Sequence, residues 1–258
     1  MKVLIGTPIN RNKSYVIDKF LDNQKEIQKE YPMSELVLTT CEIDFVDDLK
    51  KYLDSWDLRG KVLIYEVIKP DYARNRIWNI TCAREAIRQY TVSQTDAQSL
   101  LFLDSDMTFD PSVVVIMERE IRDCGVVFSG IPLHHYGTGL AGAGCVMLTR
   151  NVLESLKFRC YEFRNGEIIF EDNVLEMDLF RLGARVKKGF FVPISHYESA
   201  TDVKSVEPQP LGVVRRLTNR ALIRYVLIRT SIIIHYNIPW RLKVILGRLT
   251  ESNHKEIS

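Results

Sequence analysis

The chain has 258 residues, of which 46% are hydrophobic and 26% are charged, the ordinary composition of a globular protein. Its formal net charge is only +2, from 35 Lys and Arg against 33 Asp and Glu. This balance argues against a nucleic-acid-binding protein and against an acidic, disordered one. The length is sufficient for one large α/β domain with a sizeable core, with or without an appendage.

The small net charge hides an uneven distribution along the chain. Residues 1–207 contain 26 basic and 31 acidic residues, whereas residues 208–250 contain seven Arg, one Lys and no acidic residue. We therefore divide the chain into an acidic main domain, residues 1–207, and a basic C-terminal segment, residues 208–258. A functional interpretation has to account for both.

Cysteine usage and hydropathy exclude two further classes of protein. The five cysteines are scattered and lack C-x-x-C spacing, which argues against a disulfide framework or a zinc site and favours a reducing compartment. No stretch reaches the ~18 uncharged apolar residues that a membrane span needs. The sequence therefore predicts no membrane-spanning helix.

Short apolar runs alternate with amphipathic stretches through the first half of the chain. Strands are predicted at residues 3–6, 35–40, 61–68 and 99–103, and helices at 14–31 (with Ser14 as its cap) and 72–90. This alternation predicts a mostly parallel sheet with helices on both faces, in which ligands bind at the carboxyl ends of the strands. Four loops are therefore expected to form one pocket: residues 7–12, 41–44, 70–75 and 104–108.

The second half of the chain is less regular. Strands are predicted at 125–129, 145–149 and 186–193, and a helix at 171–182. Between the first two strands, residues 137–144 contain four glycines. Such a stretch predicts a loop that moves or lies close to a ligand.

The strongest motif is a pair of acidic residues after a hydrophobic strand. Residues 100–103 (LLFL) lead directly into Asp104, Ser105 and Asp106. Carboxylate oxygens suit hard cations such as Mg²⁺ or Mn²⁺, which bridge to substrate phosphates. The alternative is a turn in which the aspartates only satisfy backbone N–H groups. Because the pair follows an apolar strand, we favour a metal site.

Two acidic residues, Glu171 and Asp172, begin the helix predicted at 171–182. The helix dipole favours acids at this end, which is a sufficient structural explanation. The functional alternative makes one of them a general base that deprotonates an acceptor hydroxyl. The Asp104–Asp106 motif upstream favours this functional alternative.

His196 follows the strand predicted at 186–193. A lone histidine is usually structural, but a neutral imidazole is also a good third ligand for Mn²⁺ beside two carboxylates. Both interpretations stay open at this point.

A basic motif, Ala73-Arg74-Asn75-Arg76, opens the helix after the third strand. An arginine in this position can bind a pyrophosphate together with the free backbone N–H groups of the helix end. The alternative is a solvated helix face. Arg84 lies ten residues further on in a similar Ala-Arg pair, so the choice between Arg74 and Arg84 stays open.

Together these motifs resemble the GT-A glycosyltransferases of the large inverting family 2, which include the polyprenyl-phosphate mannosyltransferases. Five segments carry the resemblance in the family's order: Thr7-Pro8-Ile9-Asn10, Ala73-Arg74-Asn75, residues 101–111 (LFLDSDMTFDP), residues 142–150 (GAGCVMLTR) and Glu171-Asp172. They span residues 1 to about 200. The resemblance implies an α/β fold with a Rossmann-like mixed sheet, and a nucleotide-sugar donor.

The resemblance also implies roles for individual residues. Asp172 would be the base that activates the acceptor, with Glu171 as the second choice. Asp104, Asp106 and His196 would hold Mn²⁺ or Mg²⁺. The nucleotide-sugar would be bound by Thr7, Pro8, Asn10, Glu42, Arg74, Asn75, Asp104, Ser105 and Asp106.

The sequence departs from the family at two positions. The family usually ends its second strand on an aspartate that contacts the nucleobase, and here Glu42 or Asp44 is the substitute. Ile169-Phe170 replaces the tryptophan that often precedes the Glu-Asp pair on the acceptor side. The second departure permits an acceptor that is less like a sugar.

The basic C-terminal segment has helical periodicity. Apolar residues recur every three or four positions over 211–234, with Arg216, Arg220 and Arg224 on another face, and a second such stretch follows Pro239. Two basic amphipathic helices fit the interface of an anionic membrane. The alternatives are packing on the acidic main domain and nucleic-acid binding, for which no motif is present. We favour the membrane.

The sequence thus predicts a metal-dependent inverting glycosyltransferase, bound peripherally to the cytoplasmic face of the membrane. It would transfer a hexose to a lipid-linked or glycolipid acceptor, with GDP-mannose as the first choice of donor and UDP-glucose as the next. One rival is a sugar-phosphate nucleotidyltransferase, although the loop after the first strand matches a phosphate-binding loop poorly. The other is a non-catalytic protein of the membrane surface that binds nucleotide-sugar.

Overall fold

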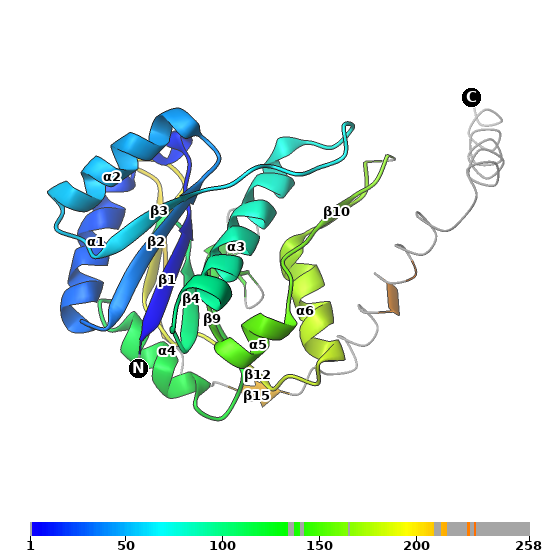
Figure 1. Ribbon diagram of the computed structural model, residues 1–258. Coiled ribbons are helices and arrows are strands. Elements are labelled where there is room, and N and C mark those ends of the chain that lie inside the picture. The colour runs from blue at the N-terminus through cyan, green and yellow to red at the C-terminus, as the bar shows by residue number, and fades with distance from the viewer. Residues whose placement is uncertain are drawn as a thin grey trace.

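The computed structural model describes residues 2–133, 137–139, 142–164, 166–208, 213–215, 226–227 and 230. A mixed eight-stranded sheet lies at its centre, in the order β15-β12-β6-β9-β4-β1-β2-β3 (Figure 1). Its strands are β1 (Val3–Pro8), β2 (Ser34–Thr40), β3 (Gly60–Ile64), β4 (Ser99–Leu103), β6 (Val126–Ser129), β9 (Cys145–Thr149), β12 (Val186–Gly189) and β15 (Val213–Arg215). Strand β9 runs antiparallel to β4 and β6, and β15 runs antiparallel to β12. The other neighbouring pairs are parallel.

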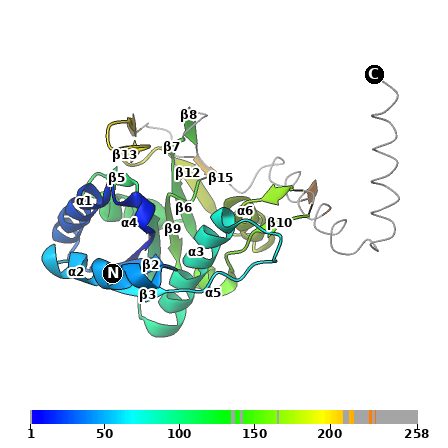
Figure 2. The same cartoon turned by 90° about the horizontal axis from the view of Figure 1, so that it is seen from above.

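Helices cover both faces of this sheet, as Figure 2 shows from above. One face carries α1 (Ile17–Glu30), α2 (Val46–Ser55) and α4 (Val113–Ile121), and the other carries α3 (Asn75–Gln94), α5 (Arg150–Ser155) and α6 (Glu171–Arg181). Two short 3₁₀ helices, η1 (Arg11–Lys13) and η2 (Ile43–Phe45), follow β1 and β2. In the part of the chain with described coordinates, no helix is long and apolar enough to cross a membrane.

The alternation of side chains along the strands divides the core between the two faces. In β1, Val3 and Ile5 pack under α1, α2 and α4, whereas Leu4 packs on the opposite side. Strand β4 is buried on both faces, since residues 100–103 are all 0% exposed. Burying each of these side chains contributes about 1.5–3 kcal/mol. The end of β4 is therefore a fixed point from which Asp104 and Asp106 project.

Three smaller sheets complete the structure. Strands β14 (Val203–Val206), β13 (Ile194–Tyr197) and β5 (Met107–Phe109) form a three-stranded antiparallel sheet, β10 (Tyr161–Glu162) pairs with β11 (Ile168–Ile169), and β7 (Ile131–Leu133) pairs with β8 (Gly137–Gly139). The register of β13 on β5 places His196 opposite Met107. Met107 directly follows Asp106 in the sequence, so this pairing brings His196 close to Asp106.

The strands and helices predicted from periodicity are present, but several of their ends differ; the helix predicted at 72–90, for example, is α3 and runs from Asn75 to Gln94. The strand predicted at 61–68 ends at Ile64, because β3 is an edge strand with a partner only on the β2 side. The strand predicted at 186–193 ends at Gly189, and the chain then turns into β13. Ser14 does not cap the first helix, because it ends η1 and α1 begins at Ile17.

The basic C-terminal segment lies mostly outside the described residues. Residues 213–215, within the stretch predicted as helical, instead form β15 at the edge of the central sheet. An edge strand such as β12 offers unpaired backbone groups to which an added strand can bond. Residues 226–227 and 230 are helical, and the two amphipathic helices predicted at 211–234 and after Pro239 otherwise fall on residues that are not described.

Candidate active site

A cavity of about 710 Å³ opens at the carboxyl ends of the parallel strands. It is bounded by the loop after β1, the turn after β4, the first turns of α3 and the start of α6. Its lining residues are Pro8, Ile9, Asn10, Asn12, Lys13, Tyr65, Arg76, Ile77, Asn79, Ile80, Asp104, Ser105, Asp106, Phe170 and Glu171. Its position agrees with the predicted meeting place of the strand-end loops.

Five of the predicted nucleotide-sugar residues line this cavity: Pro8, Asn10, Asp104, Ser105 and Asp106. Thr7 does not, because its Oγ1 donates a hydrogen bond to the carbonyl oxygen of Leu103 at 2.9 Å and ties β1 to β4. The loop at 41–44 also stays away from the cavity, and Tyr65 after β3 lines it instead.

Glu42 holds the loop after β1 in place. Its Oε2 accepts a hydrogen bond from the backbone N–H of Arg11 at 2.7 Å. The guanidinium of Arg11 in turn contacts Asp44 and Asp48. The structure therefore places Glu42 next to the cavity loop but does not make it a lining residue.

Asp106 forms one of two ion-pair clusters at the cavity. Its Oδ2 is 2.5 Å from the Nζ of Lys13 and 3.5 Å from the Nε2 of His196. Burial raises the pKa of Asp106, but His196 and Lys13 outweigh it and lower the value from 3.8 to about 2. Burial likewise lowers the pKa of Lys13, and Asp106 outweighs it so that the pKa is raised. We call Lys13, Asp106 and His196 the Lys13 cluster. The carboxylate of Asp106 and the ammonium group of Lys13 both stay charged at neutral pH.

Asp104 belongs to a second cluster, although it is only two residues away. Arg84, on α3, has a side chain that is 3% exposed. Its Nη2 is 2.9 Å from Asp104 Oδ1, and its Nη1 contacts Glu171 Oε1 on α6. We call Arg84, Asp104 and Glu171 the Arg84 cluster. A permanently charged guanidinium thus links the end of β4 to the start of α6.

Gly144 leaves the room that the Asp104 carboxylate occupies. A Cβ atom on Gly144 would lie 2.8 Å from Asp104 Oδ2, and the carbonyl oxygen of Gly144 accepts the Asp104 N–H at 3.1 Å. The predicted need for glycine close to the site is therefore met at Gly144. Residues 137–139 of the same stretch form β8.

The predicted metal ligands are only partly brought together. Asp106 Oδ2 and His196 Nε2 face a common point, whereas Asp104 Oδ1 is directed to Arg84. Among the residues with described side chains, no three His, Cys, Asp or Glu form a group that could hold a metal ion. One carboxylate and one imidazole fit a Mn²⁺ or Mg²⁺ ion that takes its other ligands from water and a diphosphate.

The two acids that begin α6 have different surroundings. Glu171 lines the cavity, is buried and contacts Arg84. Burial raises the pKa of Glu171, Arg84 opposes this, and Asp172 and Asp104 raise it further, with a net upward shift. Asp172 is half-buried on the same turn, and its Oδ1 accepts the backbone N–H of Asn173 at 2.7 Å. It is not among the lining residues.

The two arginines at the start of α3 lie in different positions relative to the cavity. Arg74 turns away from the cavity, with its Nε 2.9 Å from Glu162 Oε1 and its backbone N–H bonded to the same carboxylate. Arg76 lines the cavity. Asn75 is the first residue of α3, and its side chain lies outside the description.

Two amide oxygens in the cavity wall are left without a partner. Asn10 Oδ1 and Asn79 Oδ1 are buried and accept no hydrogen bond from the described part of the chain. An unsatisfied buried acceptor costs about 1–3 kcal/mol. Both atoms are therefore suited to accept a hydrogen bond from a bound ligand.

A second hollow of about 510 Å³ lies near the amino end of β4, lined among others by Gln98, Arg122 and Arg150. The guanidinium of Arg150, one of the cations that line this hollow, is already bonded to backbone carbonyl groups. Arg150 donates hydrogen bonds to the carbonyl oxygens of residues 91, 92, 95 and 97 and so closes the end of α3. We therefore assign this hollow a structural role.

Sequence reasoning missed Lys13, Tyr65 and Asn79. Lys13 and Arg11 lie in the same short loop, and neither spacing nor composition distinguishes the cation that reaches Asp106 from the one that binds Asp44. Arg84 was a candidate for the diphosphate only. Its role as a bridge between Asp104 and Glu171 depends on contacts between residues 20 and 87 positions apart in the sequence.

Comparison with known proteins supports the fold. No protein-family model and no curated protein sequence matches the chain. Solved structures do. TarS of S. aureus in complex with UDP has a TM-score of 0.52 at 12% identity, covering 94% of this chain and 68% of that chain. The mannosyltransferase PcManGT from Pyrobaculum calidifontis, in complex with GDP-Man and Mn²⁺, has a TM-score of 0.50 at 14% identity.

The chain has the GT-A fold. The match covers 72% of this chain and 53% of the mannosyltransferase, and a longer TarS structure (TM-score 0.53, 11% identity) is covered over only 41% of its length. The chain thus spans about half of these longer relatives. At these identities the likeness establishes the mixed α/β architecture predicted from the sequence and leaves donor, acceptor and metal to be tested.

Proposed function

We propose that the chain is a metal-dependent, inverting glycosyltransferase that transfers a hexose from a nucleoside-diphosphate sugar to a lipid-linked or glycolipid acceptor. The observation that carries this proposal is the cavity at the carboxyl ends of the strands, which contains both carboxylates of the Asp104–Asp106 motif. Lys13 and Arg76 supply positive charge for a diphosphate in the same cavity. In a chain with the GT-A fold, this combination of carboxylates and cations supports a nucleotide-sugar as the ligand.

The donor that we favour is GDP-mannose, followed by a UDP-sugar. The likeness to a mannosyltransferase in complex with GDP-Man and Mn²⁺ supports the first choice, and the likeness to TarS in complex with UDP supports the second. The oxygen atoms of Asn10 and Asn79 are available to accept hydrogen bonds from the base, the ribose or the sugar. Asp106 and His196 would hold Mn²⁺ or Mg²⁺, which neutralises charge on the diphosphate leaving group.

The base that we propose is Asp172, with Glu171 in a positioning role. The carboxylate of Glu171 contacts the buried guanidinium of Arg84, and this ion pair directs it to Arg84 instead of to an acceptor hydroxyl. Asp172 lies on the same turn and is the more exposed of the two acids. It would take the proton of the acceptor hydroxyl as that oxygen attacks the anomeric carbon and the nucleoside diphosphate leaves.

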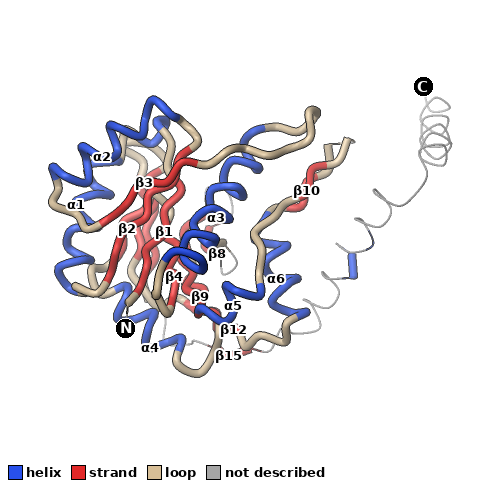
Figure 3. Tube along the Cα trace, in the orientation of Figure 1, coloured by secondary structure: helices blue, strands red, loops and turns tan. Residues whose placement is uncertain are grey.

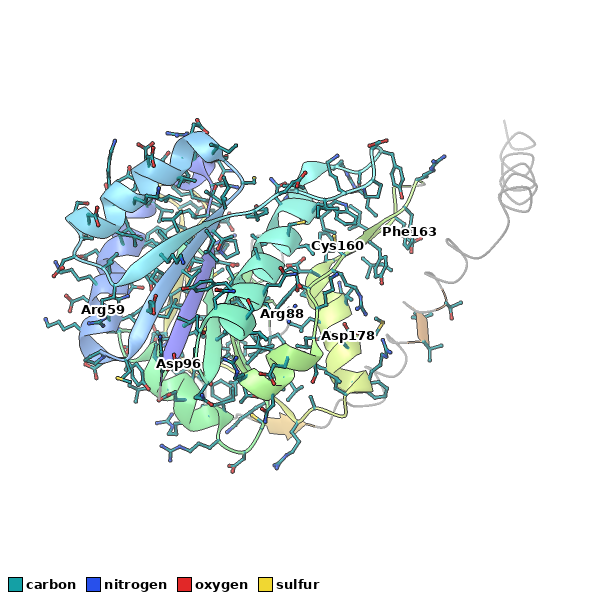
Figure 4. All side chains as sticks on the ribbon, viewed as in Figure 1. Arg59, Arg88, Asp96, Cys160, Phe163 and Asp178 are labelled. Atoms are coloured by element: carbon teal, nitrogen blue, oxygen red, sulfur yellow. The ribbon has the colours of Figure 1, made fainter. Side chains whose placement is uncertain are left out.

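Exposed apolar side chains support a lipid-linked acceptor. Phe170 lines the cavity and is 50% exposed, while Ile68 and Tyr72 are exposed on the loop between β3 and α3. Figure 3 shows this loop extending beside the β10–β11 hairpin. The hydroxyl of Tyr72 donates to the carbonyl oxygen of Glu162 at 3.0 Å and joins the two. Phe163, labelled in Figure 4, lies on the hairpin but is buried, so it does not belong to this exposed apolar surface.

The direct test is sugar transfer. The purified chain with Mn²⁺ and radiolabelled GDP-mannose or UDP-glucose should transfer label into a lipid extract, and EDTA should reduce the transfer. Asp106→Asn is the matched inactive control, because it removes the carboxylate that His196 and Lys13 share. If no common donor gives labelled lipid, the proposed function is wrong.

Peripheral binding to the cytoplasmic face of a membrane is tested separately. Deletion of residues 216–258, which retains β15, should abolish binding to anionic liposomes and leave the Kd for GDP or UDP unchanged. Anionic headgroups contribute about 1 kcal/mol for each basic residue near the surface. Loss of both liposome binding and nucleotide binding would instead indicate that the basic segment packs on the main domain.

A second candidate function is supported by one observation. Lys13 brings a cation from the loop after β1 into the cavity, a feature that a sugar-phosphate nucleotidyltransferase requires, although this loop matches a phosphate-binding loop poorly in sequence. This function predicts release of pyrophosphate from a sugar phosphate and a nucleoside triphosphate. A pyrophosphate assay without any acceptor lipid separates the two functions.

A further inference from the structure

The Lys13 cluster contains a cation of the chain itself at the place where a metal ion would bind. The Nζ of Lys13 is 2.5 Å from Asp106 Oδ2, and the Nε2 of His196 is 3.5 Å from the same oxygen. Asp106 and His196 are both buried, and Lys13 lines the cavity. The ammonium group of Lys13 is therefore bonded to the same Asp106 oxygen that faces His196.

We propose that Lys13 is an exchangeable resident cation of the donor site, which competes with the divalent ion for Asp106 and supplies positive charge to the donor diphosphate when no divalent ion is bound. A divalent ion bound to Asp106 at about 2.1 Å would place a second positive charge next to the ammonium group. Two cations at one carboxylate also repel each other. Metal binding is therefore weaker while Lys13 is bonded to Asp106 and is favoured when Lys13 moves away.

The side chain of Lys13 is suited to this exchange. Lysine carries a compact charge on a flexible four-carbon stem with three donors, and its side chain is 29% exposed here. Lys13 is paired with one carboxylate and lines the cavity, whereas Arg84 contacts Asp104 and Glu171 together. Released from Asp106, the ammonium group stays within the cavity that is proposed to hold the diphosphate.

The exchange has two consequences for binding. Without nucleotide, Lys13 lowers the affinity for a divalent ion, because its positive charge repels the ion at Asp106. With nucleotide and no divalent ion, Lys13 supplies the positive charge that the diphosphate needs. The contact between Lys13 and the diphosphate rests on the proposed function. The competition between Lys13 and the divalent ion does not, because it concerns the metal ion alone.

The first experiment measures Mn²⁺ binding to the full chain without nucleotide, by electron paramagnetic resonance of the free ion. Lys13→Met should bind Mn²⁺ about tenfold more tightly than the wild type, because the competing charge is removed. Lys13→Arg retains the charge and should stay within about threefold of the wild type. Asp106→Asn should lose Mn²⁺ binding, and Lys25→Met, on the exposed surface of α1, should change nothing.

The second experiment measures the Kd of GDP and UDP in EDTA by calorimetry. Lys13→Met should weaken binding of the preferred nucleotide about tenfold in EDTA and less in Mn²⁺, where the ion supplies the charge. Unchanged or weaker Mn²⁺ binding by Lys13→Met overturns the competition. Tighter Mn²⁺ binding with unchanged nucleotide binding in EDTA overturns the contact with the diphosphate. If neither nucleotide binds the wild type under any condition, the proposed function fails while the Mn²⁺ result stands by itself.

Discussion

Asp104 and Asp106 are two residues apart, yet their carboxylates enter two different clusters. Asp104 faces Arg84, whose side chain is 3% exposed and also contacts Glu171, so that a buried guanidinium and a buried carboxylate meet the partly exposed Asp104 between β4, α3 and α6. Asp106 faces Lys13 on the loop after β1, which lines the open cavity. Each pair joins an aspartate to a cation. The two cations differ in burial, and this difference separates the roles of the pairs. The Arg84 cluster is part of the framework, whereas the Lys13 cluster can exchange its cation.

The largest difference between the clusters is expected in stability. Arg84→Met leaves Asp104 and Glu171 without their buried partner, and loss of one member of a buried ion pair typically costs about 3–5 kcal/mol. Lys13→Met removes a partly exposed charge and should cost about 1 kcal/mol or less. Urea unfolding of both variants at pH 7 measures the contrast. Equal losses would mean that burial does not distinguish the two clusters.

The next largest effect concerns the acids at the start of α6. Asp172→Asn should lower kcat about 10²–10⁴-fold, as expected for loss of a general base, with the Kd for the donor unchanged. Glu171→Gln should have its main effect on stability, because Glu171 is a partner of Arg84. Steady-state kinetics together with urea unfolding measure both quantities, with Asp123→Asn on the exposed surface as the control.

The opposite kinetic result would reassign the base. If Glu171→Gln abolishes turnover and Asp172→Asn does not, the base is Glu171, which lines the cavity and whose pKa is raised by burial. The Arg84 cluster would then take part directly in proton transfer. Its role as a purely structural link would be wrong.

The Lys13 cluster should make a contribution to stability that depends on pH. His196 and Lys13 overcome burial and lower the pKa of Asp106 from 3.8 to about 2. A lowered acid pKa stabilises the folded state above the unfolded pKa, here by about 2 kcal/mol, and the contribution is lost as pH falls toward 2. About half of it should be gone at pH 3. The difference in unfolding free energy between wild type and Asp106→Asn, measured from pH 7 to pH 3, should shrink accordingly.

The smallest effects are expected from the two arginines at the start of α3. Arg74 pairs with Glu162 outside the cavity and is 64% exposed, so Arg74→Met should change stability by about 1 kcal/mol or less and leave nucleotide binding unchanged. Arg76 lines the cavity, and Arg76→Met should weaken binding of a nucleoside diphosphate several-fold. Calorimetric titration compares the two variants. A larger loss from Arg74→Met would restore it as the diphosphate ligand.

Much of the fold followed from local patterns. The strand at 99–103 was predicted to the residue, because a run of apolar side chains buried on both faces has no other good environment. The same run fixes where Asp104 and Asp106 emerge. The strand at 145–149 was likewise predicted with its observed ends, and the order of strands and helices indicated helices on both faces.

The errors arose where neighbours in space decide the outcome. The strand predicted at 61–68 ends at Ile64 because only one neighbouring strand supports it, and residues 213–215 form β15 because β12 offers a free edge. The segment 186–193 alternates poorly and divides between β12 and the turn into β13. Each of these results depends on pairing partners far away in the sequence.

The sequence by itself determined the two aspartates after β4, the acids at the start of α6 and the edge of the sheet at which they meet. These features depend on hydrophobic periodicity and helix ends, which are local. The tertiary structure alone decided which cation serves which carboxylate. Lys13 and Asp106 are 93 residues apart, and Arg84 and Glu171 are 87 apart. Ion pairs over such separations depend on how helices pack on the sheet, and no local pattern in the chain specifies that.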